Sequence, residues 1–504
     1  MMALLLAATL PLTAFAVEAD ISQGNVAIDD TYVSHTKDGA AQKDPHEGSV
    51  TVIQSDKSTP ASNRVTIDTS AGSTVNVTLS GVNIDTGTRG GAAVEIKGNG
   101  DVVIELDGSN TVQSGDKHAG VEKNTIAPTD TDSGSGNGNL TITDKNGTQG
   151  SLQSNGGSGG AGIGGGEAGN GSNITISGGT VTATSGGYGA GIGGGYNGTG
   201  SNINISGGTV EANGGTFGAG IGGGFNKSGS DITIEGSAEV TANGGSNGSG
   251  IGGGTQGNGS EITITGSAEV TAKGGDSGSG IGGGSNGDGN ATGSDITVSQ
   301  DARVKAQGGN QYTLFGKNYR GAGAAIGDGG EHKYGTPPSP GNDVTPNTDE
   351  LTPNGKIEYY APGANMETGA PYKTVTGTYV PPQPTEPVQS AQPEEEAPQI
   401  AAPYRVVGQD GKNLACKKAQ SSGVLTITVD ADFATLTGSA SGLKTLKAQG
   451  VETVVFVTTG ATSTFALADL LAQVPSGSTY ALTHVGSTVT LTLSSGMDIS
   501  SILK

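Results

Sequence analysis

Four aromatic residues stand at fixed distances from two successive copies of a repeated glycine phrase. Each of them lies four residues before or four residues after the isoleucine of that phrase: Tyr188, Tyr196, Phe217 and Phe225. Aromatic faces are the usual apolar platform for a sugar ring, and a few polar groups beside them complete a small-ligand site. The spacing therefore predicts a carbohydrate-binding patch on two adjacent repeats. The alternative is that the rings only cover the glycine-rich loops around them.

Other spacings resemble ligand motifs but lack the context that those motifs need. Residues 160–165 match the nucleotide-binding pattern GxGxxG, yet the pattern recurs with no helix after it, so we interpret it as a tight corner. Asn286, Asp288 and Asn290 place side-chain oxygens at alternating positions, where calcium could bind them. However, no bidentate acidic residue follows at the needed distance. The five histidines are scattered and show no metal spacing. We therefore expect no metal, no cofactor and no catalytic residue.

Charge and cysteine content limit the partners further. The chain has 47 acidic and 25 basic residues and a formal charge of −22. This disfavours nucleic acid and anionic membranes, because phosphate binding requires a basic surface. No apolar run after the first residues approaches the length of a membrane span, so no membrane insertion is expected. The single cysteine, Cys416, excludes disulfides within the chain.

The glycine phrase itself identifies the architecture. It reads GAGIGGG or GSGIGGG and recurs at steps of 29, 29, 30 and 30 residues, with an eroded copy 45 residues later. Fixed periods of this length are typical of solenoids, which need little apolar mass because each coil buries a thin stripe against its neighbours. This agrees with 94 glycines and only 32% hydrophobic residues in 504. The isoleucines of the phrase are Ile163, Ile192, Ile221, Ile251, Ile281 and, in the eroded copy, Ile326.

Between successive glycine phrases lie two short runs in which apolar and polar residues alternate. In one repeat they supply Ile203 and Ile205, then Val210 and Ala212, and the other repeats match position by position. Alternation with period 2 is typical of half-buried strands. With the isoleucine of the phrase, each coil has three short strands. We predict an all-β fold, a right-handed parallel β-helix with 29–30-residue coils whose apolar residues stack as interior ladders.

Exposed strand positions would carry any catalysis on such a scaffold. β-Helix lyases use clustered acidic residues with arginine or lysine on one strand face. Acidic residues are frequent in the regular coils, and Glu239 and Glu269 occupy equivalent sites on adjacent coils. Basic residues there are few: Lys227, Lys273, Arg303 and Lys305. We interpret these charged positions, which recur on successive coils, as a face exposed to solvent, and we predict that the protein is not an enzyme. The outward threonines reflect strand propensity rather than an ice-binding surface.

Composition divides the chain into four parts. Residues 1–19 are apolar through Ala16 and end in a small-x-small pattern, which predicts a signal peptide. Residues 20–335 are predicted to form the β-helix. Irregular coils and a cap cover 20–155, where residues 118–121 are a degenerate glycine phrase. Regular coils cover 156–335. Residues 336–403 hold 14 of the 19 prolines and a glutamate run, which suits a linker, although a hairpin around 357–360 and 372–379 remains open. Residues 404–504 show strand patterns at 423–430 and 451–457, short helix patterns at 443–446 and 465–473, and a hairpin pattern across Gly486. This alternation predicts a small α/β domain, or an α+β domain, whose role the sequence does not indicate.

The N-terminal two thirds resemble a known group of proteins. DISQGNVAID, VTLSGVNID, IELDGSNTVQSG and ISGGTVTATSGGYGAGIGGG are similar to segments of secreted glycine-rich β-helix proteins of anaerobic Gram-positive bacteria. These resemble clostridial carbohydrate-binding domains related in fold to pectate lyases. The resemblance implies a secreted or cell-surface protein that binds a polysaccharide or cell-surface glycan. A structural or adhesive stalk that binds a protein partner, through the C-terminal domain, and a β-helix polysaccharide lyase are the alternatives.

Overall fold

The chain forms two compact units, which comprise residues 1–384 and 385–504. The computed structural model describes residues 17–46, 48–125, 136–285, 291–314, 317–331, 339–379, 404–408, 414, 416–421, 423–439, 443, 446–447, 450–473, 479–493 and 497–503. No helix among them is long and apolar enough to cross a membrane.

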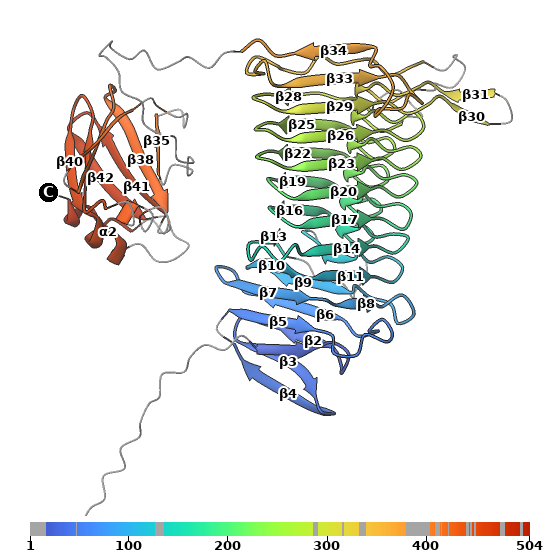
Figure 1. Cartoon of the computed structure of the whole chain (residues 1–504), viewed down its shortest axis with the longest axis horizontal. Coiled ribbons are helices and arrows are strands. Elements are labelled where there is room, and N and C mark those ends of the chain that lie inside the picture. The colour runs from blue at the N-terminus through green and yellow to red at the C-terminus, as the bar shows by residue number, and fades with distance from the viewer. Residues whose placement is uncertain are drawn as a thin grey trace, which may run out of the picture. The chain divides into compact units, whose positions relative to one another are not determined.

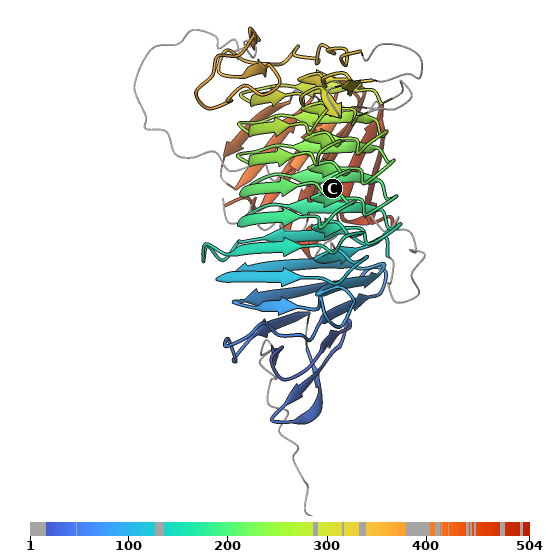
Figure 2. The same ribbon diagram turned by 90° about the vertical axis from the view of Figure 1, so that its right-hand side faces the viewer.

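The first unit is a stack of coils whose strands form three sheets, here called A, B and C (Figures 1 and 2). Sheet A contains β1 (Val17–Asp20), β5 (Ser49–Ile53), β7 (Thr74–Ser80), β10 (Asp101–Asp107), β13 (Leu140–Thr143), β16 (Gly171–Ile176), β19 (Gly200–Ile205), β22 (Gly229–Ile234), β25 (Gly259–Ile264) and β28 (Ile296–Val298). Sheet C contains β8 (Asn83–Asp85), β11 (Ser109–Gln113), β14 (Ser151–Asn155), β17 (Thr180–Thr184), β20 (Thr209–Asn213), β23 (Glu239–Asn243), β26 (Glu269–Lys273), β29 (Arg303–Gln307) and β33 (Lys356–Tyr360). Neighbouring strands within these two sets are parallel.

Sheet B holds the glycine phrases and has the shortest strands. Its parallel members are β2 (Val26–Ile28), β6 (Val65–Thr69), β9 (Val94–Gly98), β12 (Val121–Lys123), β15 (Ile163–Gly164), β18 (Ile192–Gly193), β21 (Ile221–Gly222), β24 (Ile251–Gly252), β27 (Ile281–Gly282) and β32 (Ile326–Gly327). The three sheets confirm the predicted all-β parallel β-helix, and the coils are consistent with the right-handed form.

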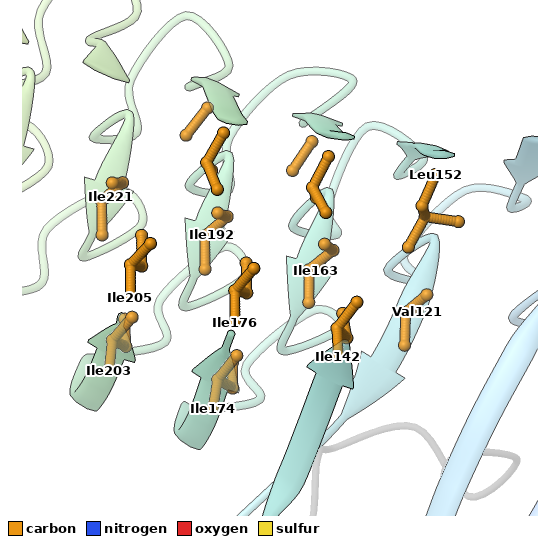
Figure 3. Close-up of a cluster of buried hydrophobic side chains, with 14 of the residues drawn as sticks. Val121, Ile142, Leu152, Ile163, Ile174, Ile176, Ile192, Ile203, Ile205 and Ile221 are labelled. Carbon is orange, nitrogen blue, oxygen red and sulfur yellow. The ribbon is translucent and has the colours of Figure 1, made fainter. Parts of the chain in front are cut away.

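The predicted ladders form the interior of this unit (Figure 3). Ile221 pairs with Ile192 on one side and with Ile251 on the other, and all three are fully buried. Along sheets A and C the inward isoleucines, valines and alanines of successive coils also pair in register. Because each residue contacts its equivalents above and below, a thin apolar stripe per coil makes one continuous core.

Backbone conformation explains why glycine follows each ladder isoleucine. Gly222 adopts φ +129°, a region that side chains with a Cβ rarely enter. A Cβ at this position would also lie 2.1 Å from the carbonyl oxygen of Gly252 in the next coil. That oxygen accepts a hydrogen bond from Gly223, so it cannot move away freely. The repeated Ile-Gly step is therefore required by the corner itself.

The N-terminal coils are irregular in length but continue the same three sheets. Val121 pairs with Ile163, so residues 118–121 do mark a degenerate glycine phrase, as predicted. A hairpin of β3 (Tyr32–Lys37) and β4 (Ala40–Pro45) pairs antiparallel with β2 at this end of sheet B. Val17 to Ala19, the last residues of the predicted signal segment 1–19, lie in β1 and pair with β5. Residues 1–16 lie outside the described part of the chain.

The opposite end corrects the predicted linker over residues 336–403. β33 pairs parallel with β29, so it adds a further strand to sheet C, and Ile357 and Tyr359 are buried in the common core. β34 (Lys373–Thr376) pairs antiparallel with β33, which confirms the hairpin that the sequence left open. Residues 339–379 therefore belong to the β-helix unit. A second hairpin, β30 (Tyr312–Leu314) and β31 (Lys317–Arg320), extends sideways from the coils (Figure 1).

Limited proteolysis should therefore cut first between residues 380 and 403 and release two folded fragments. The described core residues of the first unit end before this segment, those of the second begin at Tyr404, and the segment is rich in proline and glutamate. Mass spectrometry of the earliest fragments gives the cut sites. First cuts inside residues 339–379 would contradict the pairing of β33 with β29. First cuts inside the glycine coils would contradict the stacked arrangement of those coils.

The second unit contains two four-stranded sheets, and helical residues at 443, 446–447 and 467–473 lie between some of their strands along the chain. One comprises β35 (Tyr404–Val407), β38 (Phe433–Ser439), β41 (Thr479–Val485) and β42 (Thr488–Leu493), and the other comprises β36 (Lys417–Ser421), β37 (Val424–Thr428), β39 (Thr453–Val457) and β40 (Thr462–Ala466). A helix, α2 (Leu467–Gln473), and a 3-10 turn (Ser500–Ile502) complete the described elements.

Several local predictions for this unit are confirmed. The strands at 424–428 and 453–457 and the hairpin across Gly486 are present. Only the β37–β39 pair is parallel among the described pairs, so the pairing does not fit the α/β class and favours the α+β alternative. The predicted helix over 465–473 begins at Leu467, because Phe465 is buried on strand β40 and pairs with Val454.

Candidate functional site

The four predicted aromatic residues form one cluster on the loops that flank sheet B. Tyr188 and Phe217 precede β18 and β21, and their rings stack with centroids 5.4 Å apart and planes 14° apart. Tyr196 and Phe225 follow the same strands and stack at 5.6 Å and 9°. Edge-to-face contacts at 5.2 and 5.3 Å join the two stacks within each coil. The cluster is therefore a two-by-two array of rings.

Backbone hydrogen bonds position the array. The amide of Phe225 donates to the carbonyl of Tyr188 at 2.9 Å, and the amide of Thr255 donates to Phe217 in the same way at 2.8 Å. These bonds tie the loop after sheet B in one coil to the loop before sheet B in the previous coil. In the next coils Asn247 and Thr255 occupy the aromatic positions, so the array is two coils wide. The period of the repeat thus sets the spacing of the rings.

Exposure differs among the rings in a way that the sequence did not predict. Tyr188 is 41% exposed, whereas Tyr196, Phe217 and Phe225 are half-buried. All four rings are therefore partly exposed, although each ring covers one face of its equivalent in the adjacent coil. What remains open to a ligand is the outer side of the array, with Tyr188 as its most exposed member.

A shallow groove lies on the outer face of sheet C over its last four strands. It encloses about 520 Å³ and is lined by outward residues of β23, β26, β29 and β33. One column of paired residues reads Glu239, Glu269, Arg303 and Lys356 in register. The adjacent column reads Thr241, Thr271, Lys305 and Glu358. The groove thus has carboxylates at one end and mixed charges at the other.

Amide side chains line a second hollow of about 460 Å³ beside the first, at the ends of the same strands. Asn213, Asn243 and Lys273 pair in register and contribute to it. Gln307 continues this column but is buried, because its Nε2 donates to the carbonyls of Ala361 and Ala364. The Asn243 amide donates to Asn213 Oδ1 at 2.9 Å. Amides, lysine and carboxylates in register offer donors and acceptors of the kind that bind sugar hydroxyls.

The acidic and basic residues singled out from the sequence are brought together only in part. Arg303 Nη1 lies 3.8 Å from Glu269 Oε1, but both side chains are more than 60% exposed. Three other acidic residues of the regular coils, Asp231, Glu261 and Asp295, lie elsewhere, near the start of the sheet A strands, with φ between +51° and +54°. Exposed ion pairs in water give little electrostatic advantage, so this contact alone does not make a catalytic centre.

Three lining residues of the groove were missed by the sequence analysis: Asn354, Lys356 and Glu358. They lie in the segment that was predicted to be a linker. The alternating pattern of Lys356, Ile357, Glu358 and Tyr359 was the available signal, since it places two charged side chains outward and two apolar ones inward. Lys356 Nζ lies 2.6 Å from Glu358 Oε1.

Within the part of the chain that the structure describes, no group of three or more His, Cys, Asp or Glu side chains could hold a metal ion. The candidate calcium loop at 286–290 lies outside that part. The GxGxxG segment at 160–165 forms a coil corner and β15, and no helix follows it.

A family model described as a β-helix repeat matches residues 174–196, 203–225, 232–255 and 262–285. Each matched segment begins at an isoleucine of sheet A, passes through sheet C and ends four residues beyond the isoleucine of sheet B. No curated protein and no solved structure matched the chain. The repeat model and the coil geometry agree over residues 174–285, so this part of the chain consists of β-helix repeats.

Proposed function

We propose that this β-helix repeat protein is a secreted, non-enzymatic carbohydrate-binding protein that acts at a cell surface. The observation that supports this most strongly is the aromatic array, in which Tyr188 is 41% exposed. Exposed large apolar side chains are rare in the described part of the first unit: Tyr32, Tyr188 and Tyr372. An aromatic cluster at an exposed, periodic edge is a suitable apolar contact for sugars.

Binding would combine weak contacts along the coils. The open side of the array contacts a sugar ring, and the amides and charged side chains of sheet C hydrogen-bond its hydroxyls. Because the rings recur on two adjacent coils and polar side chains recur along sheet C, a polymer with repeating units can engage several of these groups, and avidity raises the overall affinity. Such binding requires neither a metal nor a cofactor. The apolar segment 1–16 supports secretion.

Replacing Tyr188 and Phe217 together with alanine should weaken retention on an insoluble polysaccharide. Each ring contributes about 1 kcal/mol to an aromatic contact, so the double variant should bind roughly 30-fold more weakly. A panel of cellulose, chitin, xylan and bacterial wall polysaccharide is suitable, with the bound fraction measured by depletion from solution.

The matched control is Tyr32→Ala. Tyr32 is 40% exposed, but it lies on β3 in the N-terminal hairpin. This variant should bind like the wild type. The melting temperature of each variant should be measured as well, so that a loss of binding is not caused by a loss of folding. If the wild type binds no polysaccharide, or if the double variant binds as well as the wild type, the site assignment fails. The protein would then be better explained as an adhesive stalk, with its C-terminal unit as the candidate for binding a protein partner.

A polysaccharide lyase is the second candidate, because the groove on sheet C places Glu269 beside Arg303. In this elimination a base removes the proton on the carbon beside the uronate carboxylate, the bond from the next carbon to the glycosidic oxygen breaks, and that oxygen leaves with one chain end. The double bond that forms makes an unsaturated sugar that absorbs ultraviolet light. Incubation with uronic-acid polysaccharides should give no such absorbance if binding is non-catalytic. Product formation that Arg303→Gln abolishes would overturn the non-enzymatic proposal.

A further inference from the structure

A third hollow lies on the N-terminal coils, away from the residues discussed above. It encloses about 420 Å³ and is lined by Asn25, Ser62, Arg64, Thr86, Arg89, Gly90, Gly91 and His118. These residues come from four successive loops that lead into β2, β6, β9 and β12. Val26, Val65, Val94 and Val121 pair in register just behind them, so the loops are stacked coil upon coil.

The hollow is positively charged in a strongly acidic protein. Two of the five arginines in the chain line it, and no carboxylate is among its described lining residues. Neither Arg64 nor Arg89 has a carboxylate oxygen within 4.0 Å among the described residues. Arginines with no ion partner, gathered from separate coils, indicate a site for an anion that the protein itself does not supply.

Neighbouring groups position both guanidinium groups. Arg89 Nη1 donates to Asn63 Oδ1 at 3.3 Å, and Asn63 is itself held because its Nδ2 donates to the carbonyl of Ile21 at 2.9 Å. Arg64 passes beside Gly91, where an added Cβ would lie only 3.0 Å from Arg64 Nη1. Glycine at 91 thus gives the Arg64 side chain its space next to the loop that carries Arg89.

His118 forms the third basic wall of the hollow and is only 6% exposed. Its Nδ1 lies 3.0 Å from Oε2 of the buried Glu122. The same carboxylate accepts hydrogen bonds from the amide of Ala119 at 3.0 Å and from Asn124 Nδ2 at 2.9 Å. Glu122 therefore fixes the imidazole in place, and its carboxylate is held at His118 rather than at either arginine.

We propose that this hollow binds a tetrahedral oxyanion, a phosphate or a sulfate group. A carboxylate has two oxygens, which a single arginine can occupy as a bidentate pair. Two guanidinium groups from different coils that line one hollow suit a group that has three or four acceptor oxygens and a charge near −2. The proposal does not depend on glycan binding by the aromatic array.

Titration calorimetry of the full chain in chloride buffer tests the proposal, with inorganic phosphate, sulfate and glucuronate as separate probes. Phosphate, sulfate or both should bind, and the two arms show which oxyanion is preferred. Glucuronate should bind at least about tenfold more weakly. The double variant Arg64→Gln/Arg89→Gln should lose roughly 100-fold in affinity, about tenfold for each arginine. Affinity should fall as chloride rises.

Arg303→Gln is the matched control, because it removes an arginine from sheet C and leaves the hollow intact. It should bind the oxyanion like the wild type. If the double variant does not fold, the single variant Arg89→Gln, whose side chain is exposed, gives the same comparison with a smaller loss. Absence of binding by the wild type, undiminished binding by the arginine variants, or equal affinity for glucuronate would overturn the assignment. Each of these outcomes leaves the polysaccharide-retention test unaffected.

Discussion

Ile221→Asp is expected to abolish cooperative folding of the β-helix unit. Ile221 is fully buried and lies between Ile192 and Ile251 in the sheet B ladder. Aspartate there would place a charge among apolar side chains with no partner and would remove the packing of the isoleucine. Together these effects should cost at least about 4 kcal/mol. Because each coil is stabilised by its neighbours, the loss should spread to the adjacent coils.

Calorimetry or circular dichroism during heating gives the measurement. The β-helix transition should disappear or fall sharply in temperature, while the transition of the C-terminal unit remains, since the two units have separate cores. Thr263→Asp is the control, because Thr263 is an outward residue of β25 between Thr233 and Thr297. It should change stability little. Retention of the wild-type melting curve by Ile221→Asp would contradict a continuous interior ladder.

Gly222→Ala should be the second most damaging single change, although it adds only one methyl group. The φ angle of +129° costs a residue with a Cβ about 1–3 kcal/mol. The new Cβ would also lie 2.1 Å from the carbonyl oxygen of Gly252, which is held in the sheet B ladder. Relief of this clash requires that two coils move apart. We expect a total loss of about 4 kcal/mol or more.

Gly72→Ala separates the two contributions. Gly72 also has a positive φ, +85°, but a Cβ there would meet no heavy atom within 4 Å. Gly72→Ala should therefore lower the free energy of unfolding only by the cost of the backbone conformation, about 1–2 kcal/mol. Comparable losses in urea denaturation for both variants would show that the close approach of successive coils at Gly222 is unimportant.

The regular part of the fold could be predicted because its period is visible in the chain. Steps of 29 or 30 residues place each ladder isoleucine over its predecessor, and the alternating runs assign inward and outward side chains without knowledge of any contact. The same period predicted that Tyr188 would meet Phe217 and that Tyr196 would meet Phe225. It did not predict how the rings would orient, because stacking between coils depends on side-chain geometry that no spacing specifies.

Outside the regular repeats, only the tertiary structure shows which residues lie together. The strands of sheet B in the N-terminal coils begin at residues 26, 65, 94 and 121, so the coil lengths differ and register cannot be counted along the chain. Arg64, Arg89 and His118 therefore appear unrelated in sequence, although stacked loops bring them to one hollow. In the same way, proline content concealed β33, whose inward Ile357 and Tyr359 complete the core over the last regular coil. A solenoid leaves an apolar surface at its open end, and the segment that covers it is selected by burial and strand pairing rather than by composition.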